Sequence, residues 1–266
     1  MSVQFKIIQV FDQPEKAYRG NVAAVLMLHE LPDEEAMQAI AADLAQPATT
    51  FLAPAPVHGE FLIRWFAPDG EIGLCGHGAL AAVAFLQDHA YSAELKLHYS
   101  NGLVKGNGLG QNMAEIGLPA IEITGTEEPD QALTEGLGVP IKSYHPSGNK
   151  DIVVLESERD LVRMTPDFVR LRDRQTFGYA VTAPGERTDF VSRTLVPFVS
   201  QLEDHATGSS HALLTPFWAR KLSREDLTAE QLSPRKGSFS CHFDERNNEV
   251  WLKGHFKILA SGEMSL

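Results

Sequence analysis

The chain has 266 residues, of which 43% are hydrophobic and 22% are charged, and its formal net charge at pH 7 is −12. A chain of this length and composition buries a substantial core and has room for two domains of about 130 residues each. The negative charge argues against a nucleic-acid surface or a peripheral membrane patch, and no apolar run is long enough to span a bilayer, so we expect a cytoplasmic protein. Its two cysteines, Cys75 and Cys241, form neither a disulfide framework nor a metal cluster.

The first half of the chain is predicted to combine strands with two helices. Apolar patterns predict strands at residues 5–11, 22–28, 49–52, 60–66, 94–99, 102–105 and 113–118. A first helix begins after Pro32, with acidic residues at its positive end, and Pro47 ends it. The second helix follows a glycine-bearing loop and carries a candidate site.

That second helix lies in residues 73–86 and has an unusual composition. Gly76 and Gly78 flank His77, and the eight residues that follow carry no charged or polar side chain. A helix that is apolar on every side is buried, and the amide N–H groups of its first turn then need partners. Glycines at such a turn let a small anion approach the backbone closely. We therefore expect an anion site here, with His77 beside it and Cys75 at its edge.

The second half repeats this pattern of elements. Strands are expected at residues 151–155, 177–183, 189–194, 238–243, 249–252 and 256–260. Helices are expected at residues 161–171, 208–218 and 228–232. Turn-forming residues at 124–130 place the boundary, so residues 1–124 form one domain and 125–266 the other. The sequence leaves open whether the C-terminal segment crosses back to the first domain.

A shift of the sequence by 132 residues aligns the two glycine-bearing loops and the helices that follow them. The identical pairs are Phe66 with Phe198, Glu71 with Glu203, Gly76 with Gly208, and Phe85 with Phe217. A second polar loop that leads into a second mostly apolar helix favours internal duplication over coincidence. Two such helix starts suggest one site shared by two pseudo-symmetric halves.

Two motifs at these helix starts resemble those of the PhzF phenazine-biosynthesis isomerase family, which is itself similar in fold to diaminopimelate epimerases. They are Cys-Gly-His at residues 75–77 and Asp-x-x-Thr-Gly-Ser at 204–209, accompanied by Arg-Gly-Asn at 19–21 and Trp-Phe-Ala-Pro at 65–68. The resemblance implies an α/β (α+β) fold of two halves, each a curved mixed sheet wrapped around one buried helix. It also implies a homodimer, no cofactor or metal, and a site in the cleft between the halves.

The family's reaction relocates a proton in a small cyclic enol-ether carboxylate by means of a glutamate in a Ser-Glu-Thr-x-Phe segment. In this chain the segment is Pro-Ala-Thr-Thr-Phe at residues 47–51, so Ala48 occupies the place of the glutamate. Loss of a positioned acid/base group typically lowers a rate by about 10²–10⁴-fold. The paired cysteines of the epimerases fall on Cys75 and Thr207, and a threonine hydroxyl is too weak an acid for two-thiol racemisation.

The resemblance and the motifs together assign roles to the candidate residues. His77 and Asp204 are the expected catalytic residues. The expected substrate-binding residues are Gly76, Gly78, Gly208, Ser209 and Ser210. Asp204 has an alternative role as an acceptor for loop amides, and Cys75 is either an inert buried thiol or a reactive one.

Three functions remain open at this point. The first is a cofactor-independent isomerase that acts on a small cyclic or enolic carboxylate. The second is a non-catalytic binding or regulatory protein that kept the cleft and lost the acid/base group. The third, a lyase or racemase with Cys75 as base, is weaker because Thr207 supplies no partner thiol.

Overall fold

The structure is a computed structural model that describes residues 2–89 and 94–265. The chain forms two compact units, one of residues Met1–Leu118 with Trp251–Leu266 and the other of residues Pro119–Val250. Each unit has its own central helix, and each is described by itself. None of the described helices has the length and apolar character needed to cross a membrane.

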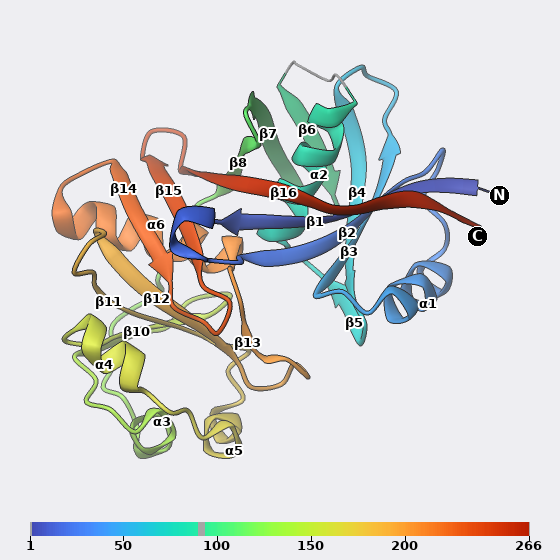
Figure 1. The fold of residues 1–266 in the computed structure, drawn as a ribbon. Coiled ribbons are helices and arrows are strands. Elements are labelled where there is room, and N and C mark those ends of the chain that lie inside the picture. Colours follow the sequence, from blue (N-terminus) through green and yellow to red (C-terminus); the bar gives the residue numbers. More distant parts are fainter. Residues whose placement is uncertain (1, 90–93, 266) are drawn as a thin grey trace. The chain divides into compact units, whose positions relative to one another are not determined.

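The first unit is a sheet that closes around a helix. Its strands are β1 (Ser2–Asp12), β2 (Asn21–Met27), β3 (Ala48–Pro54), β4 (Glu60–Ala67), β5 (Gly70–Ile72), β6 (Leu95–Tyr99), β7 (Gly102–Gly110), β8 (Met113–Pro119) and β16 (Glu249–Ser265). Apart from β5, which pairs with β4, they follow the order β1-β2-β3-β4-β6-β7-β8-β16. Because β16 also pairs antiparallel with β1, the sheet returns to its first strand (Figure 1).

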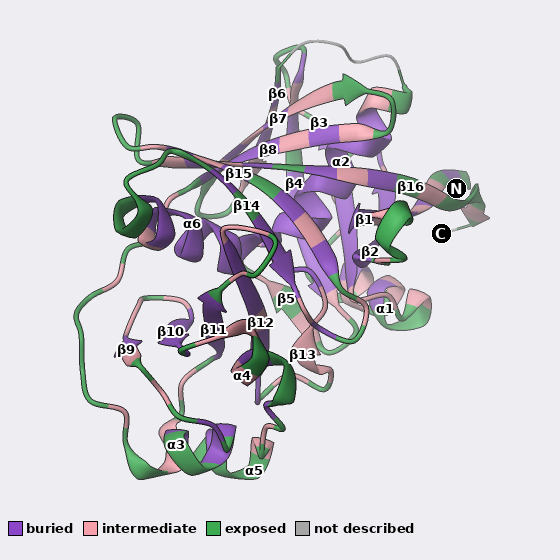
Figure 2. Ribbon diagram, turned by 60° about the vertical axis from the view of Figure 1, so that its left-hand side comes forward, coloured by how far each residue is buried: buried purple, intermediate pink, exposed green. Residues whose placement is uncertain are grey.

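The enclosed helix is α2 (Gly76–Asp88), which lies where the sequence predicts a buried helix. Every residue from Gly76 to Leu86 is buried (Figure 2). The opposite face of β2 and β3 is covered by α1 (Glu34–Leu44), whose Met37 and Ala41 pack against the sheet. Strands β2 and β3 are therefore buried on both faces, which explains their nearly continuous apolar sequences.

The second unit packs helices on both faces of an open mixed sheet. Its strands are β9 (Ser143–His145), β10 (Asp151–Val154), β11 (Tyr179–Pro184), β12 (Phe190–Val196), β13 (Leu202–Asp204), β14 (Asp226–Gln231) and β15 (Gly237–Asp244). Its helices are α3 (Gln131–Leu137), α4 (Glu158–Arg163), α5 (Phe168–Leu171) and the central α6 (Gly208–Leu222). Two short 3-10 helices, η1 (Pro14–Lys16) and η2 (Arg172–Arg174), complete the described elements of the two units.

Helix α6 contains a proline, Pro216, which removes one hydrogen bond of the helix. Pro216 has no N–H, so the carbonyl of Ala212, four residues earlier, lacks its usual helical donor. The N–H of Ile121 donates to that carbonyl at 3.0 Å. The segment after β8 is thereby fixed against α6.

The expected α/β fold class is confirmed, and three local predictions are corrected. The helix predicted at 161–171 is interrupted between α4 and α5, because Pro166 disfavours the helical conformation of the residue before it. The helix predicted at 228–232 is wrong: residues 228–231 belong to β14, where pairing with β12 and β15 overrides their weak local preference. The strands predicted at 249–252 and 256–260 are parts of the single strand β16.

Candidate functional site

The start of α2 brings together the residues that the Cys-Gly-His motif singled out. Cys75 is the N-cap residue, and its Sγ accepts a hydrogen bond from the backbone N–H of Gly78 at 3.4 Å. The thiol is 3% exposed. Cys75 therefore has a structural role, because it satisfies one of the amides that a buried helix start leaves without a partner.

His77 has a hydrogen-bond partner that the sequence analysis did not place in the site. Its Nδ1 lies 3.2 Å from Nδ2 of Asn21, the first residue of β2. The Oδ1 of Asn21 accepts from the N–H of Val22 at 3.0 Å, so its amide nitrogen faces the histidine. This orientation makes Nδ1 of His77 the acceptor from Asn21 and leaves Nε2 as the donor nitrogen of the ring. Sγ of Cys75 lies 3.6 Å from Nδ1 and 3.7 Å from Nε2. His77 thus presents an N–H donor.

Ala48 is the first residue of β3 and is fully buried. Two residues later, the Thr50 hydroxyl donates to the carbonyl of Gly78 at 3.3 Å, so this face of β3 is turned toward α2. Because side chains alternate along a strand, Ala48 lies on the same face. Its register partner on β2 is Ala23, two residues from Asn21. Ala48, which the family resemblance places at the position of the glutamate, is therefore on the α2-facing wall.

Of the two glycines in the first turn of α2, Gly78 is the one that side-chain packing requires. A Cβ on Gly78 would lie 2.6 Å from Cδ1 of Trp65 and 2.9 Å from Oγ1 of Thr50. Trp65 is 1% exposed and has no room to move away. Gly78 is thus required for packing α2 against β3 and β4. Gly76, the first residue of the helix, is buried beside it.

In the second unit, Asp204 at the end of β13 organises the loop before α6. Its Oδ1 accepts from the N–H of His205 at 2.9 Å, and its Oδ2 accepts from the hydroxyl of Thr207 at 2.7 Å. Gln231 on β14 closes the loop, because its Oε1 accepts from the N–H of Thr207 at 2.8 Å and its Nε2 donates to the backbone oxygen of Asp204 at 2.5 Å. Asp204 does bind loop donors, as its alternative role predicts, and its orientation is fixed by them.

The first turn of α6 contains three of the five residues predicted to bind substrate, and all three are buried. They are Gly208, Ser209 and Ser210. The Oγ of Ser210 accepts from the hydroxyl of Thr194 at 2.9 Å, which ties its side chain to β12. The Oγ of Ser209 accepts from Nζ of Lys150 at 2.9 Å. Neither Lys150 nor Gln231 was assigned a role from sequence.

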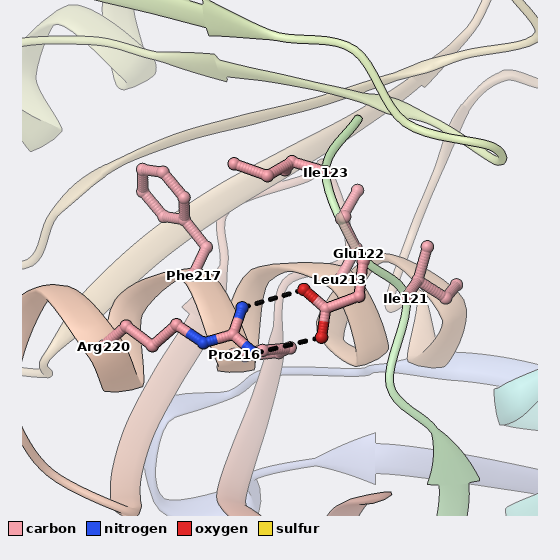
Figure 3. Close-up of a pocket in the computed structure, with 7 residues that line it drawn as sticks. All are labelled: Ile121, Glu122, Ile123, Leu213, Pro216, Phe217 and Arg220. Carbon is pink, nitrogen blue, oxygen red and sulfur yellow. Dashed lines mark hydrogen bonds and ion pairs between the residues drawn. The ribbon is translucent and has the colours of Figure 1, made fainter. Parts of the chain in front are cut away.

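A small cavity of about 220 Å³ lies farther along α6 (Figure 3). Its apolar wall includes Leu213 and Phe217, and its polar side is the bidentate ion pair of Arg220 with Glu122. None of the predicted site residues lines it. Among the described residues, no group of histidine, cysteine and acidic side chains has an arrangement that would hold a metal ion.

Comparisons with known proteins agree with the motifs. A family model described as phenazine biosynthesis-like protein, PhzC-PhzF, matches residues 9–262. An uncharacterized isomerase of Pseudomonas aeruginosa is 34% identical over 266 residues, which cover 99% of this chain and 100% of the relative. A PhzF-family phenazine biosynthesis protein of Enterococcus faecalis has a crystal structure with a TM-score of 0.88 and 33% identity, and the match covers 100% of each chain.

More distant structures share the fold alone. A hydroxyproline epimerase from Agrobacterium vitis matches with a TM-score of 0.68 at 10% identity, covering 100% of this chain and 93% of that one. The family model and the relative from Pseudomonas aeruginosa match almost the entire sequence. The chain belongs to the PhzC-PhzF family of phenazine biosynthesis-like proteins.

Proposed function

We propose that this protein is an isomerase that relocates a proton in a small cyclic or enolic carboxylate, without a cofactor. His77 and Asp204 share the proton work, and the residues that hold the carboxylate are Gly76, Gly78, Gly208, Ser209 and Ser210. The observation that carries the proposal is the contact of 3.2 Å between Nδ2 of Asn21 and Nδ1 of His77. Because Asn21 occupies Nδ1, the histidine offers a proton on Nε2 at a helix start that favours the neutral ring.

The proposed step uses the two groups differently. The Nε2–H of His77 donates to an oxygen of the substrate, which stabilises the negative charge that develops there. Asp204 accepts the proton that leaves one carbon, the π electrons shift across the ring or enol, and Asp204 returns the proton to the second carbon. Thr207 and His205 hold the carboxylate of Asp204 in place through its two oxygens. No proton is gained or lost overall.

Deuterium incorporation tests this step. Cyclic and enolic carboxylates are incubated with the protein in D₂O, and proton NMR follows the loss of C–H signal. We expect exchange with the wild type and a rate about 10²–10⁴-fold lower for Asp204→Asn and His77→Ala. His77→Gln, which keeps an N–H donor, should retain more activity than His77→Ala. Absence of exchange in every carboxylate tried would contradict the isomerase proposal.

Ala48 favours a second candidate, a non-catalytic protein that binds the same class of ligand. A methyl group neither donates nor accepts a proton, and it stands where the family's proton carrier is expected. Ala48→Glu separates the two candidates, with Ala48→Gln as the matched control for size and polarity. If the protein only binds, Ala48→Glu should create exchange from none. If it is an isomerase, the wild type already exchanges and the variant changes that rate.

We also propose, from the family resemblance, a homodimer located in the cytoplasm. Light scattering on the purified protein tests the first part: it should give twice the mass of one chain. A mass equal to one chain over the accessible concentration range would contradict it.

A further inference from the structure

A buried glutamine contacts the loop that carries Asp204. Gln231, the last residue of β14, is 0% exposed. Its Oε1 accepts from the N–H of Thr207 at 2.8 Å, and its Nε2 donates to the backbone oxygen of Asp204 at 2.5 Å and to Oγ1 of Thr207 at 3.2 Å. Exchanging the two ends of the amide would set its NH₂ group against the N–H of Thr207. The orientation of the amide is therefore fixed by its partners.

The glutamine also sets the direction of the Thr207 hydroxyl. Because Nε2 of Gln231 can only donate, Oγ1 of Thr207 is the acceptor in their contact. The single hydroxyl proton of Thr207 then lies toward Oδ2 of Asp204, with 2.7 Å between the two oxygens. Thr207 is 4% exposed, and in buried surroundings each hydrogen bond of a chain polarises the next. Gln231, Thr207 and Asp204 thus form a relay of donors that ends on the carboxylate.

The register of the sheet brings the glutamine to this loop. Strand β11 pairs with one edge of β12 over residues 190–195. Strands β14 and β13 share the other edge, where Gln231 is the register partner of Ser192 and Asp204 is that of Thr194. The two strands therefore end next to each other, at positions that are two residues apart along β12.

The two oxygens of the Asp204 carboxylate depend on donors of different kinds. Oδ1 accepts from the backbone N–H of His205, which any residue at that position except proline would supply. Oδ2 accepts from the hydroxyl of Thr207, whose proton keeps its direction because Gln231 donates to the same oxygen. Removal of Gln231 also takes the amide donor from the backbone oxygen of Asp204, and that oxygen then competes for the hydroxyl proton.

We infer that Gln231 is a positioning residue, which acts through Thr207 to hold the carboxylate of Asp204 in one orientation. The inference rests on the proposed function, which makes Asp204 the proton acceptor. A displaced acceptor slows proton transfer, since reaction requires close alignment of the two atoms that share the proton. Ligand binding does not use this alignment. Loss of Gln231 should therefore lower kcat and leave KM in place.

The test compares the kinetics of deuterium exchange in matched variants. Gln231→Met keeps the length of the side chain and loses its amide, and Gln201→Met is the control. Gln201 donates to the backbone oxygen of Glu203 at 3.1 Å and contacts Nδ1 of His205 at 3.0 Å, so it holds the same loop through other atoms. We expect Gln231→Met to lower kcat by about 10-fold with KM nearly unchanged. Gln201→Met should leave both constants close to those of the wild type.

A second set of variants tests whether Gln231 acts through Thr207. Thr207→Val removes the hydroxyl with little change of shape, and Thr207→Ser keeps it. We expect valine to lower kcat by about 10-fold and serine to retain most of it. In Thr207→Val, the further change Gln231→Met should cost much less than it does in the wild type, because residues of one network are not additive.

The ¹³C resonance of the Asp204 carboxyl group gives the same comparison without a substrate. At pH 7 it should shift in Gln231→Met and in Thr207→Val, because both changes disturb the donor to Oδ2. It should keep its wild-type position in Gln201→Met and Thr207→Ser.

Equal losses of kcat in Gln231→Met and Gln201→Met would overturn the inference, and so would a Thr207→Val that keeps the wild-type kcat. If Gln231→Met does not fold, the side-chain amide resonance of Gln231 decides, because it should shift in Thr207→Val and not in Thr207→Ser. An unchanged amide resonance would contradict the relay. Failure of the proposed function is distinguishable: no deuterium exchange in any carboxylate removes the isomerase, while the carboxyl resonance of Asp204 still tests the relay.

Discussion

His211 is buried in the core of the second unit as a neutral ring. Its Nδ1 donates to the backbone oxygen of Thr207 at 2.9 Å, and the ring stacks on Phe239 with centroids 3.6 Å apart. Burial lowers the pKa of His211 to about 4 from its usual 6.5. The folded state therefore disfavours the proton that the unfolded chain binds readily.

This difference predicts a loss of stability in acid. Above pH 6.5 His211 is neutral in both the folded and the unfolded state and lowers stability in neither. As the pH falls from 6.5 toward 4, the unfolded chain binds a proton that the folded state does not, so the free energy of unfolding decreases. The total decrease is about 3 kcal/mol once the pH is below 4. Urea unfolding of the wild type and of His211→Gln from pH 7 to pH 4 measures it. The variant should show the shallower decline, whereas His29→Gln, at an exposed site, should follow the wild type. Parallel curves for all three proteins would contradict the prediction.

Cys75 is expected to act through its hydrogen bond and not through thiol chemistry. Cys75→Ser keeps an acceptor for the N–H of Gly78, whereas Cys75→Ala removes it. We expect the alanine variant to have a free energy of unfolding about 1 kcal/mol lower than the serine variant. Both variants should retain turnover if His77 and Asp204 carry the protons. Loss of turnover in a folded Cys75→Ser would favour the racemase or lyase with a cysteine base.

At the scale of elements, the contact between α2 and its sheet depends on Gly78. Alanine would gain about 1 kcal/mol in helix propensity, but its Cβ would clash with the buried Trp65. Overpacking of this kind costs about 1–3 kcal/mol. Gly78→Ala should therefore be less stable than the wild type in thermal and urea unfolding. Gly73→Ala, where a Cβ meets nothing within 4 Å, is the control and should be close to neutral. A stabilised Gly78→Ala would show that the helix start is not closely packed.

The elements with strong apolar patterns could be predicted from the sequence. Helix α2 has no charged residue through its buried part, and it was predicted within two residues of its end. Prediction failed where the local preference for helix or strand was weak, or where pairing with neighbouring strands overruled it. Residues 226–231 form a strand only because two neighbouring strands pair with them, and α3, with seven residues, was not predicted.

The candidate site could be predicted in part. The residues that could not be predicted are all distant in sequence from the groups that they contact. His77, Cys75 and Asp204 stand in loops next to the central helices, where glycines mark the turns. Asn21, Lys150 and Gln231 reach those loops from other strands or turns, 56, 59 and 24 residues away from the groups that they contact. No local pattern encodes such pairings. Only the register of the sheets brings these residues to the helix starts.

At the scale of the whole molecule, the chain contains two helix starts of related sequence, each with its own polar set. The first has a histidine that contacts Asn21, and the second has a carboxylate held by loop donors and a buried lysine. A hydrogen-bond donor and a proton acceptor are both needed for proton relocation in a small carboxylate, and each helix start has one of them. We propose, from the family resemblance, that one ligand uses both.

A crystal structure of the protein with a bound unsaturated ring carboxylate, such as benzoate or cyclohex-1-ene-1-carboxylate, tests that claim most directly. We expect one ligand whose carboxylate lies within hydrogen-bond distance of Ser209 Oγ and of the amides of Gly208 and Ser210. The same molecule should be within reach of His77 Nε2 and Asp204. A ligand that contacts only one of the two helix starts, or that binds elsewhere with both of them covered by side chains, would contradict the account.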